Sequence, residues 1–173
     1  SYELCPDIAI VDANLCCSMP AHVTANTGLD ALTHAIEAYV TPMADTFTNA
    51  MAERAVIDIV HTLPTVVADG HDLEARQTMH NASCLAGMAF TNALLGIVHS
   101  MAHQVGGTFA IPHGRANAIL LPNVIRFNAQ VAETQYARLA RLIGYENAEQ
   151  LATAIEVLRS KVGVEDGFQA YGV

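Results

Sequence analysis

The chain has 173 residues, which suits one domain or part of a larger protein, and 52% of them are hydrophobic. Charged residues make up only 14%, so we expect part of the surface to be covered by another domain or subunit. The net charge of −9 and the lack of any basic run in the sequence argue against a nucleic-acid-binding protein.

The cysteines indicate a reducing compartment. Their spacing fits neither a secreted disulfide framework nor a CxxC zinc motif, since two of the four are adjacent: Cys5, Cys16, Cys17 and Cys84. The first residues show no secretory signal pattern, and the most apolar stretch, 84–98, is too short to cross a bilayer. We therefore expect a soluble cytoplasmic protein that binds neither membranes nor nucleic acid.

The first elements are one short strand and two helices. A β-branched run over Ile8–Val11 predicts the strand. Thr27 is the predicted N-cap of a helix that reaches about Val40 and is stopped by Pro42. Asp45 or Thr46 is expected to cap the next helix, which runs to Pro64.

The remaining chain also has helical character. A long segment rich in small residues predicts a buried central helix over about 73–92. The next helix, 94–105, carries two histidines and is expected to end at Gly106-Gly107. Three further helices are predicted after the turn at Pro112: from 114 to about 127, then QYARLARLIG (135–144) and AEQLATAIEVLRSKVG (148–163).

The predicted architecture is an all-α, multi-helix bundle preceded by a single strand. A lone strand is not stable by itself. The end, GFQAYGV, has no terminal cap or polar tail. We therefore expect the chain to be part of a longer protein at both ends.

Five polar residues stand out in apolar surroundings. Asp30 and His34 are four residues apart and so lie on one face of a helix, as do His99 and His103; His113 follows the glycine pair. A carboxylate and several imidazoles are ligand types that hold zinc or ferrous iron. Two imidazoles among apolar neighbours need partners, because burying them unpaired costs free energy. The pattern predicts a divalent metal site.

Other interpretations of the same residues carry less weight or stay open. A lone helix histidine is more often a hydrogen-bonded core residue than a ligand, and Asp30 alone could serve the helix dipole. A zinc protease is disfavoured because Ser100 stands where its HExxH motif needs glutamate. The glycine pair follows a helix, without a lysine, so a helix end is favoured over a phosphate loop. Glu37 fits a base beside the ligands and a solvated or structural acid about equally.

The segments GLDALTHAIEAYVT and GMAFTNALLGIVHSMAHQVGGTFAIPHGRANAILLPNVIRFN resemble the iron-containing (group III) alcohol dehydrogenases. The resemblance covers almost the whole chain, from AIVDANLCCSMP to the region of YARLARLIG. It implies a dehydroquinate synthase-like helical domain that follows an α/β nucleotide-binding domain. Residues 1–20 would then be the end of the α/β domain and a linker. Residues 21–173 would be the helical metal-binding domain, truncated at its C-terminal end.

By the same resemblance, the metal ligands would be Asp30, His34, His99 and His113. His103 would be the unligated histidine that relays protons or positions the nicotinamide, and Phe90 would line the substrate pocket. The implied cofactors are Fe²⁺ or Zn²⁺ and NAD or NADP, the latter bound mainly by a domain absent from this chain. The family's glycine-rich pyrophosphate loop is missing from the sequence, and no cofactor-binding residue is assigned.

The resemblance predicts the metal-binding catalytic domain of an NAD(P)-dependent alcohol dehydrogenase or aldehyde reductase, acting on a small alcohol or aldehyde. The isolated chain would be inactive without the nucleotide-binding domain. One alternative is a stand-alone helical metal-binding module without dehydrogenase activity; another is a helical domain for subunit contact, with its histidines satisfied in the core. The low charge favours a homodimer or larger assembly.

Overall fold

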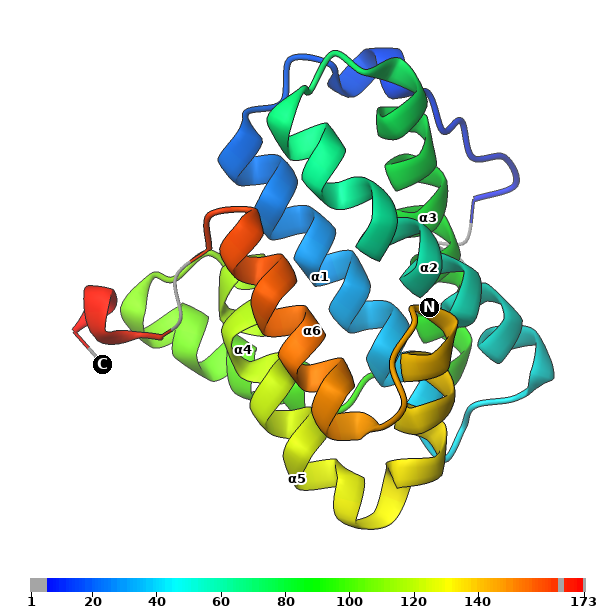
Figure 1. Cartoon of the computed structure of the whole chain (residues 1–173). Coiled ribbons are helices and arrows are strands. Elements are labelled where there is room, and N and C mark those ends of the chain that lie inside the picture. The colour runs from blue at the N-terminus through cyan, green and yellow to red at the C-terminus, as the bar shows by residue number, and fades with distance from the viewer. Residues whose placement is uncertain (1–5, 165–166, 173) are drawn as a thin grey trace.

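The structure is a computed structural model that describes residues 6–164 and 167–172, and in these residues it is all-helical, as predicted (Figure 1). The α-helices run in the order α1 (Ala21–Val40), α2 (Thr46–Ala68), α3 (Leu73–Ala93), α4 (Ile97–Phe109), α5 (His113–Leu142) and α6 (Ala148–Lys161). The described residues also form two short 3₁₀ helices, η2 (Ala13–Cys16) and η3 (Gln169–Tyr171), which flank the α-helices.

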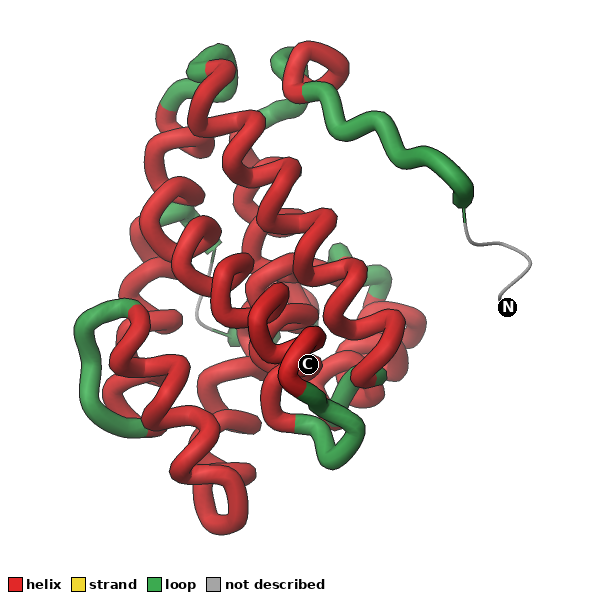
Figure 2. Tube along the Cα trace, turned by 90° about the vertical axis from the view of Figure 1, so that its right-hand side faces the viewer, coloured by secondary structure: helices red, strands yellow, loops and turns green. Residues whose placement is uncertain are grey.

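The predicted strand at Ile8–Val11 is wrong. These residues form no strand, and Figure 2 shows the segment before η2 running away from the helices as a loop. Ile8 and Ile10 are about four-fifths exposed, at 81% and 83%. A strand needs a neighbouring strand for its backbone hydrogen bonds, and the described part of the chain contains none.

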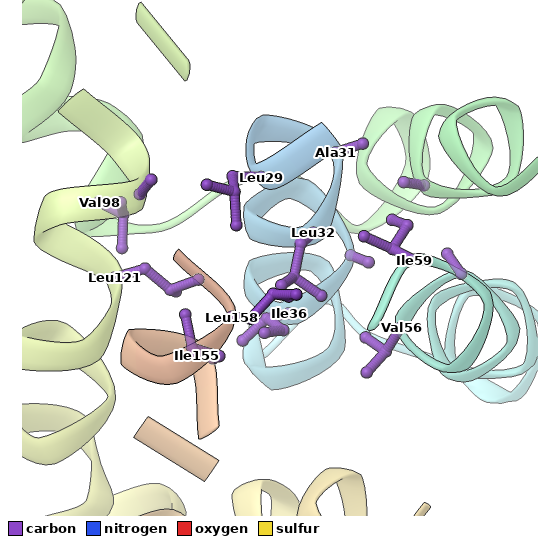
Figure 3. Close-up of a cluster of buried hydrophobic side chains, with 14 of the residues drawn as sticks. Leu29, Ala31, Leu32, Ile36, Val56, Ile59, Val98, Leu121, Ile155 and Leu158 are labelled. Atoms are coloured by element: carbon purple, nitrogen blue, oxygen red, sulfur yellow. The ribbon is translucent and has the colours of Figure 1, made fainter. Parts of the chain in front are cut away.

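Helix α1 is the central element of the bundle, packed against α2, α3 and α5. Its residues Leu29, Leu32 and Ile36 are at most 1% exposed. Figure 3 shows them between Val56 and Ile59 of α2 on one side and apolar residues of α5 and α6 on the other. Because α1 is covered from both sides, polar residues on it need partners within the fold.

Helix α1 begins at Ala21, earlier than the predicted cap at Thr27. Pro20 precedes the first turn, and its carbonyl accepts hydrogen bonds from the N–H groups of Val23 and Thr24. Thr27 instead donates its hydroxyl to the carbonyl of Val23, one turn back in the same helix. A threonine bonded in this way lies within a helix and caps nothing.

The other helices agree with the prediction in position but not in every boundary. Asp45 caps α2 in a capping box with Thr48, as expected, but the helix continues past Pro64 to Ala68. Helix α4 begins at Ile97 and passes through the glycine pair to Phe109, where Ala110 in the left-handed conformation ends it. The helices predicted over 114–127 and 135–144 belong to one element, α5, which is kinked at Ala132.

Three cysteines of the described residues, Cys16, Cys17 and Cys84, are free thiols, and Cys5 lies outside the described residues. Among the described helices, no single one is both long and apolar enough to cross a membrane. The pair α3 and α4, bent by 106°, meets the length and composition test only when taken together.

Candidate metal centre

The five polar residues singled out in the sequence come together at one place, where α1, α4 and α5 meet. Asp30 and His34 lie on α1, His99 and His103 on α4, and His113 is the first residue of α5. The helical spacing of four residues aligns each pair along one helix face. Only the packing of the helices brings the three segments, far apart in sequence, to a common point.

Asp30, His99 and His113 form the tightest group, with one ligand atom of each within 4.8 Å of the others. Asp30 Oδ1 lies 3.7 Å from His99 Nε2 and 3.5 Å from His113 Nε2. Two ligands bound at 2.0–2.2 Å to a tetrahedral ion are about 3.4 Å apart. The donor types and their spacing therefore fit a divalent transition metal with little rearrangement.

His34 and His103 lie beside this group. The Nδ1 of His34 is 4.0 Å from Asp30 Oδ2, and its ring stacks on His99 with centroids 4.4 Å apart. His103 stacks on His113 at 5.1 Å and is exposed. The structure therefore places His34 next to the three ligand atoms and His103 at the outer, solvent-facing side of the cluster.

Phe90 of α3 contacts the cluster by stacking on the ring of His34. The two rings are stacked, with centroids 4.5 Å apart and an interplanar angle of 19°. Phe90 is partly buried and packs against the hydrophobic core. It therefore forms an apolar wall next to a polar cluster, as a substrate-lining residue would.

Glu37, whose role the sequence leaves open, is a buried partner of His99. Its Oε2 accepts a hydrogen bond of 2.6 Å from His99 Nδ1, and its Oε1 accepts one of 2.8 Å from the backbone N–H of Val98. The carboxylate thus orients the imidazole and satisfies the first turn of α4. A proton held on Nδ1 leaves Nε2 facing Asp30 and His113.

Asn117, one turn after His113 on α5, was not predicted as a site residue. It is fully buried, and its Nδ2 lies 2.6 Å from Asp30 Oδ1, 3.0 Å from His99 Nε2 and 3.1 Å from His113 Nε2. A pattern of ligand residue types does not single out an amide. The only available signal is its spacing of four residues from His113.

The charges of the cluster shift its pKa values. Burial alone would lower the pKa of His99, but hydrogen bonds and charges from Asp30 and Glu37 outweigh this and raise the pKa to about 9. Burial lowers the pKa of His34. Burial would raise the pKa of Asp30. Hydrogen bonds from His99 and Asn117, together with the charges of the nearby histidines, outweigh burial and lower this pKa. Asp30 is therefore an anion at neutral pH, and a metal ion at His99 would displace a proton.

Access to the cluster is one-sided. The side chain of His99 is 3% exposed and that of Asp30 20%, whereas that of His113 is 42% exposed. A small molecule can approach from the side of His113 and His103, while α1 and the core close the other side. Buried ligands with one open side are typical of a catalytic rather than a purely structural metal site.

Comparison with known proteins identifies the family. Residues 24–173 match the model of the Fe-containing alcohol dehydrogenase family, C-terminal, and the chain belongs to this family. It is 55% identical over 148 residues to 1-propanol dehydrogenase PduQ of Salmonella typhimurium, covering 84% of this chain and 40% of that protein. It is 46% identical over 178 residues to the NADPH-dependent butanol dehydrogenase of Clostridium saccharobutylicum, covering 99% and 45%.

The fold agrees with this assignment. The crystal structure of a 1,3-propanediol oxidoreductase superposes with a TM-score of 0.96 at 44% identity, covering 100% of this chain and 47% of that one. The all-helical architecture is therefore that of the C-terminal domain of iron-containing alcohol dehydrogenases. The chain spans less than half the length of these relatives.

Proposed function

We propose that this chain is the metal-binding catalytic domain of an NAD(P)-dependent alcohol dehydrogenase or aldehyde reductase acting on small alcohols and aldehydes. The observation that carries the proposal is the placement of Asp30, His99 and His113 at the mutual distances of metal ligands. The names of the relatives, a 1-propanol and an NADPH-dependent butanol dehydrogenase, support the reaction class and the nicotinamide cofactor.

Asp30, His34, His99 and His113 would hold the ion, ferrous iron or zinc. His34 already lies against His99 and beside Asp30. When bound, such an ion supplies Lewis-acid chemistry, polarising the alcohol or carbonyl oxygen for hydride transfer. Glu37 keeps the Nε2 of His99 directed at the site, so its part is to position a ligand.

We assign different roles to two residues beside the proposed ligands, His103 and Phe90. His103, exposed and stacked on His113, is placed to relay protons to solvent or to contact the nicotinamide. Phe90 excludes water from one side and favours substrates with a short apolar chain. Nucleotide binding would depend mainly on a further domain, so we expect the 173-residue chain alone to bind metal without efficient hydride transfer. We also propose that the protein forms a homodimer or a larger assembly.

Two substitutions, one at the proposed ligand Asp30 and one at the proposed non-ligand His103, test which residues bind the metal. We expect His103→Ala to retain the metal, because its ring lies outside the ligand group, and to impair aldehyde reduction by NAD(P)H in a protein that includes the nucleotide-binding domain. Asp30→Asn is the matched comparison and should lose both metal and activity. Metal analysis of the two purified variants, alongside NAD(P)H oxidation with propanal, measures both effects. Loss of metal from His103→Ala would show that the ligand assignment is wrong.

A further inference from the structure

The amide of Asn117 faces the same three atoms that would bind a metal ion. Its Nδ2 is within 3.1 Å of Asp30 Oδ1, His99 Nε2 and His113 Nε2. An NH₂ group has two hydrogens to donate. The shortest contact, 2.6 Å, gives one of them to the Asp30 carboxylate, and the NH₂ group also lies 3.0 Å from His99 Nε2 and 3.1 Å from His113 Nε2.

This arrangement and a bound ion exclude one another. An ion held by the three atoms would lie 2.0–2.2 Å from each of them. The NH₂ group of Asn117 lies in that same space and donates a hydrogen bond to the Asp30 carboxylate, with the imidazole nitrogens of His99 and His113 3.0 and 3.1 Å away. A cation there would take the carboxylate lone pair of Asp30 from the amide and repel the amide hydrogens.

The other end of the amide is not held in place. Asn117 Oδ1 is buried and has no hydrogen-bond partner among the residues that the structure describes. The orientation of this fully buried side chain therefore depends on what Nδ2 donates to. Once an ion engages the Asp30 carboxylate, no hydrogen bond to Oδ1 from the described residues keeps the amide where it is.

We propose that Asn117 is a placeholder for the metal: its amide holds Asp30, His99 and His113 together before the ion binds and is displaced when the ion arrives. This inference rests on the proposed metal site. Asn117 then stabilises the metal-free chain selectively and competes with the ion. A residue that serves only packing would stabilise the metal-free and metal-bound chains equally.

The test is Asn117→Leu, which keeps most of the side-chain volume and removes the donor. Thermal unfolding of the chain with chelator and with saturating zinc, and a zinc titration against a competing chelator, give the two readouts. We expect a lower Tm mainly without zinc, and zinc binding about tenfold tighter, the size of one hydrogen bond to a charged group. Asn49→Leu is the control: Asn49 lies on α2, which contributes no residue to the cluster, and its buried Oδ1 has no partner within the described part of the chain.

Other outcomes identify which claim fails. Equal losses of Tm in both states with unchanged zinc affinity would make Asn117 a packing residue and overturn the placeholder role alone. Weaker zinc binding would show that the amide supports the bound state, again overturning it. Wild-type chain that binds no zinc would overturn the metal site and the placeholder role together.

A measurement on the wild-type chain tests the proposal even if the Asn117→Leu variant does not fold. The side-chain amide signals of Asn117 in a ¹⁵N–¹H spectrum report the hydrogen bond to Asp30 directly. We expect them to shift strongly on titration with diamagnetic zinc, as the amide loses its acceptors. Signals that stay in place while zinc binds would contradict the proposal.

Discussion

A single buried carboxylate, Glu37, both orients His99 and caps the first turn of α4. Its two oxygens accept from His99 Nδ1 and from the backbone N–H of Val98. An acid at a helix N-terminus is also stabilised by the helix dipole. Because both oxygens of Glu37 accept a hydrogen bond, the positions of the His99 ring and of the Val98 backbone depend on a carboxylate here, which an amide cannot replace.

We therefore expect Glu37→Gln to weaken metal binding by about 10- to 100-fold, as the loss of a carboxylate behind a ligating histidine does. Glutamine has one acceptor oxygen for two N–H groups, so Val98 or His99 loses its partner, or His99 changes tautomer and turns an N–H toward Asp30. A chelator-competition titration with zinc measures the effect.

Glu53→Gln is the matched control. Glu53 accepts a hydrogen bond from Tyr39 and pairs with Arg138, and no member of the metal cluster contacts it among the interactions described for this residue. Its substitution should leave zinc affinity unchanged. If Glu37→Gln binds zinc as tightly as wild type, the carboxylate does not orient His99 for ligation.

Residue types and spacing in the sequence are enough to bring Asp30, His34, His99, His103 and His113 into one hypothesis. The structure places all five in one cluster. The roles of Glu37 and Asn117 were not predictable in the same way, because each depends on a contact between helices. Glu37 meets Val98 and His99 across 61 and 62 residues of chain, and Asn117 meets Asp30 across 87.

At the scale of elements, the site depends on how closely α5 approaches α1. A Cβ added at Gly114, the residue after His113, would collide with the backbone carbonyl oxygen of Asn26 and lie 3.1 Å from the Cβ of Asp30. Neither atom belongs to a flexible side-chain end that could move aside. Glycine is therefore required here for close packing of two backbones.

We expect Gly114→Ala to destabilise the chain by about 1–3 kcal/mol, the usual cost of overpacking, and to weaken zinc binding because His113 moves away from Asp30. Gly107→Ala is the control: a Cβ at this helical position meets nothing within 4 Å. It should be stabilising by about 0.5–1 kcal/mol, since alanine favours a helix interior over glycine. Denaturant unfolding and zinc titration measure both variants. A neutral effect of Gly114→Ala would contradict the tight α1–α5 contact.

Helix positions were predictable, but several helix ends were not. Pro64 and Gly106-Gly107 are residues that predict helix ends, yet α2 and α4 continue through them. In α2, Leu63 and Val66 on either side of the proline are fully buried, so core packing outweighs the lost backbone hydrogen bond. Local propensity therefore located the elements, and tertiary contacts determined their lengths.

At the scale of the whole molecule, the bundle supplies a closed core and a histidine cluster that opens to solvent at His103 and His113. Helix α1 contributes Asp30 and His34 to the site and Leu29, Leu32 and Ile36 to the core, so stability and metal binding depend on the same helix. Metal binding should therefore be coupled to folding. The exposed segment around Ile8 and Ile10 lies outside this core.

The most direct test of the central claim is elemental analysis of the purified chain, never exposed to chelator, counting iron and zinc. We predict about one ion per chain for a single cluster of this ligand set, and none for Asp30→Asn. Wild-type chain that stays free of both metals, even after reconstitution with ferrous iron or zinc, would contradict the metal centre formed by α1, α4 and α5.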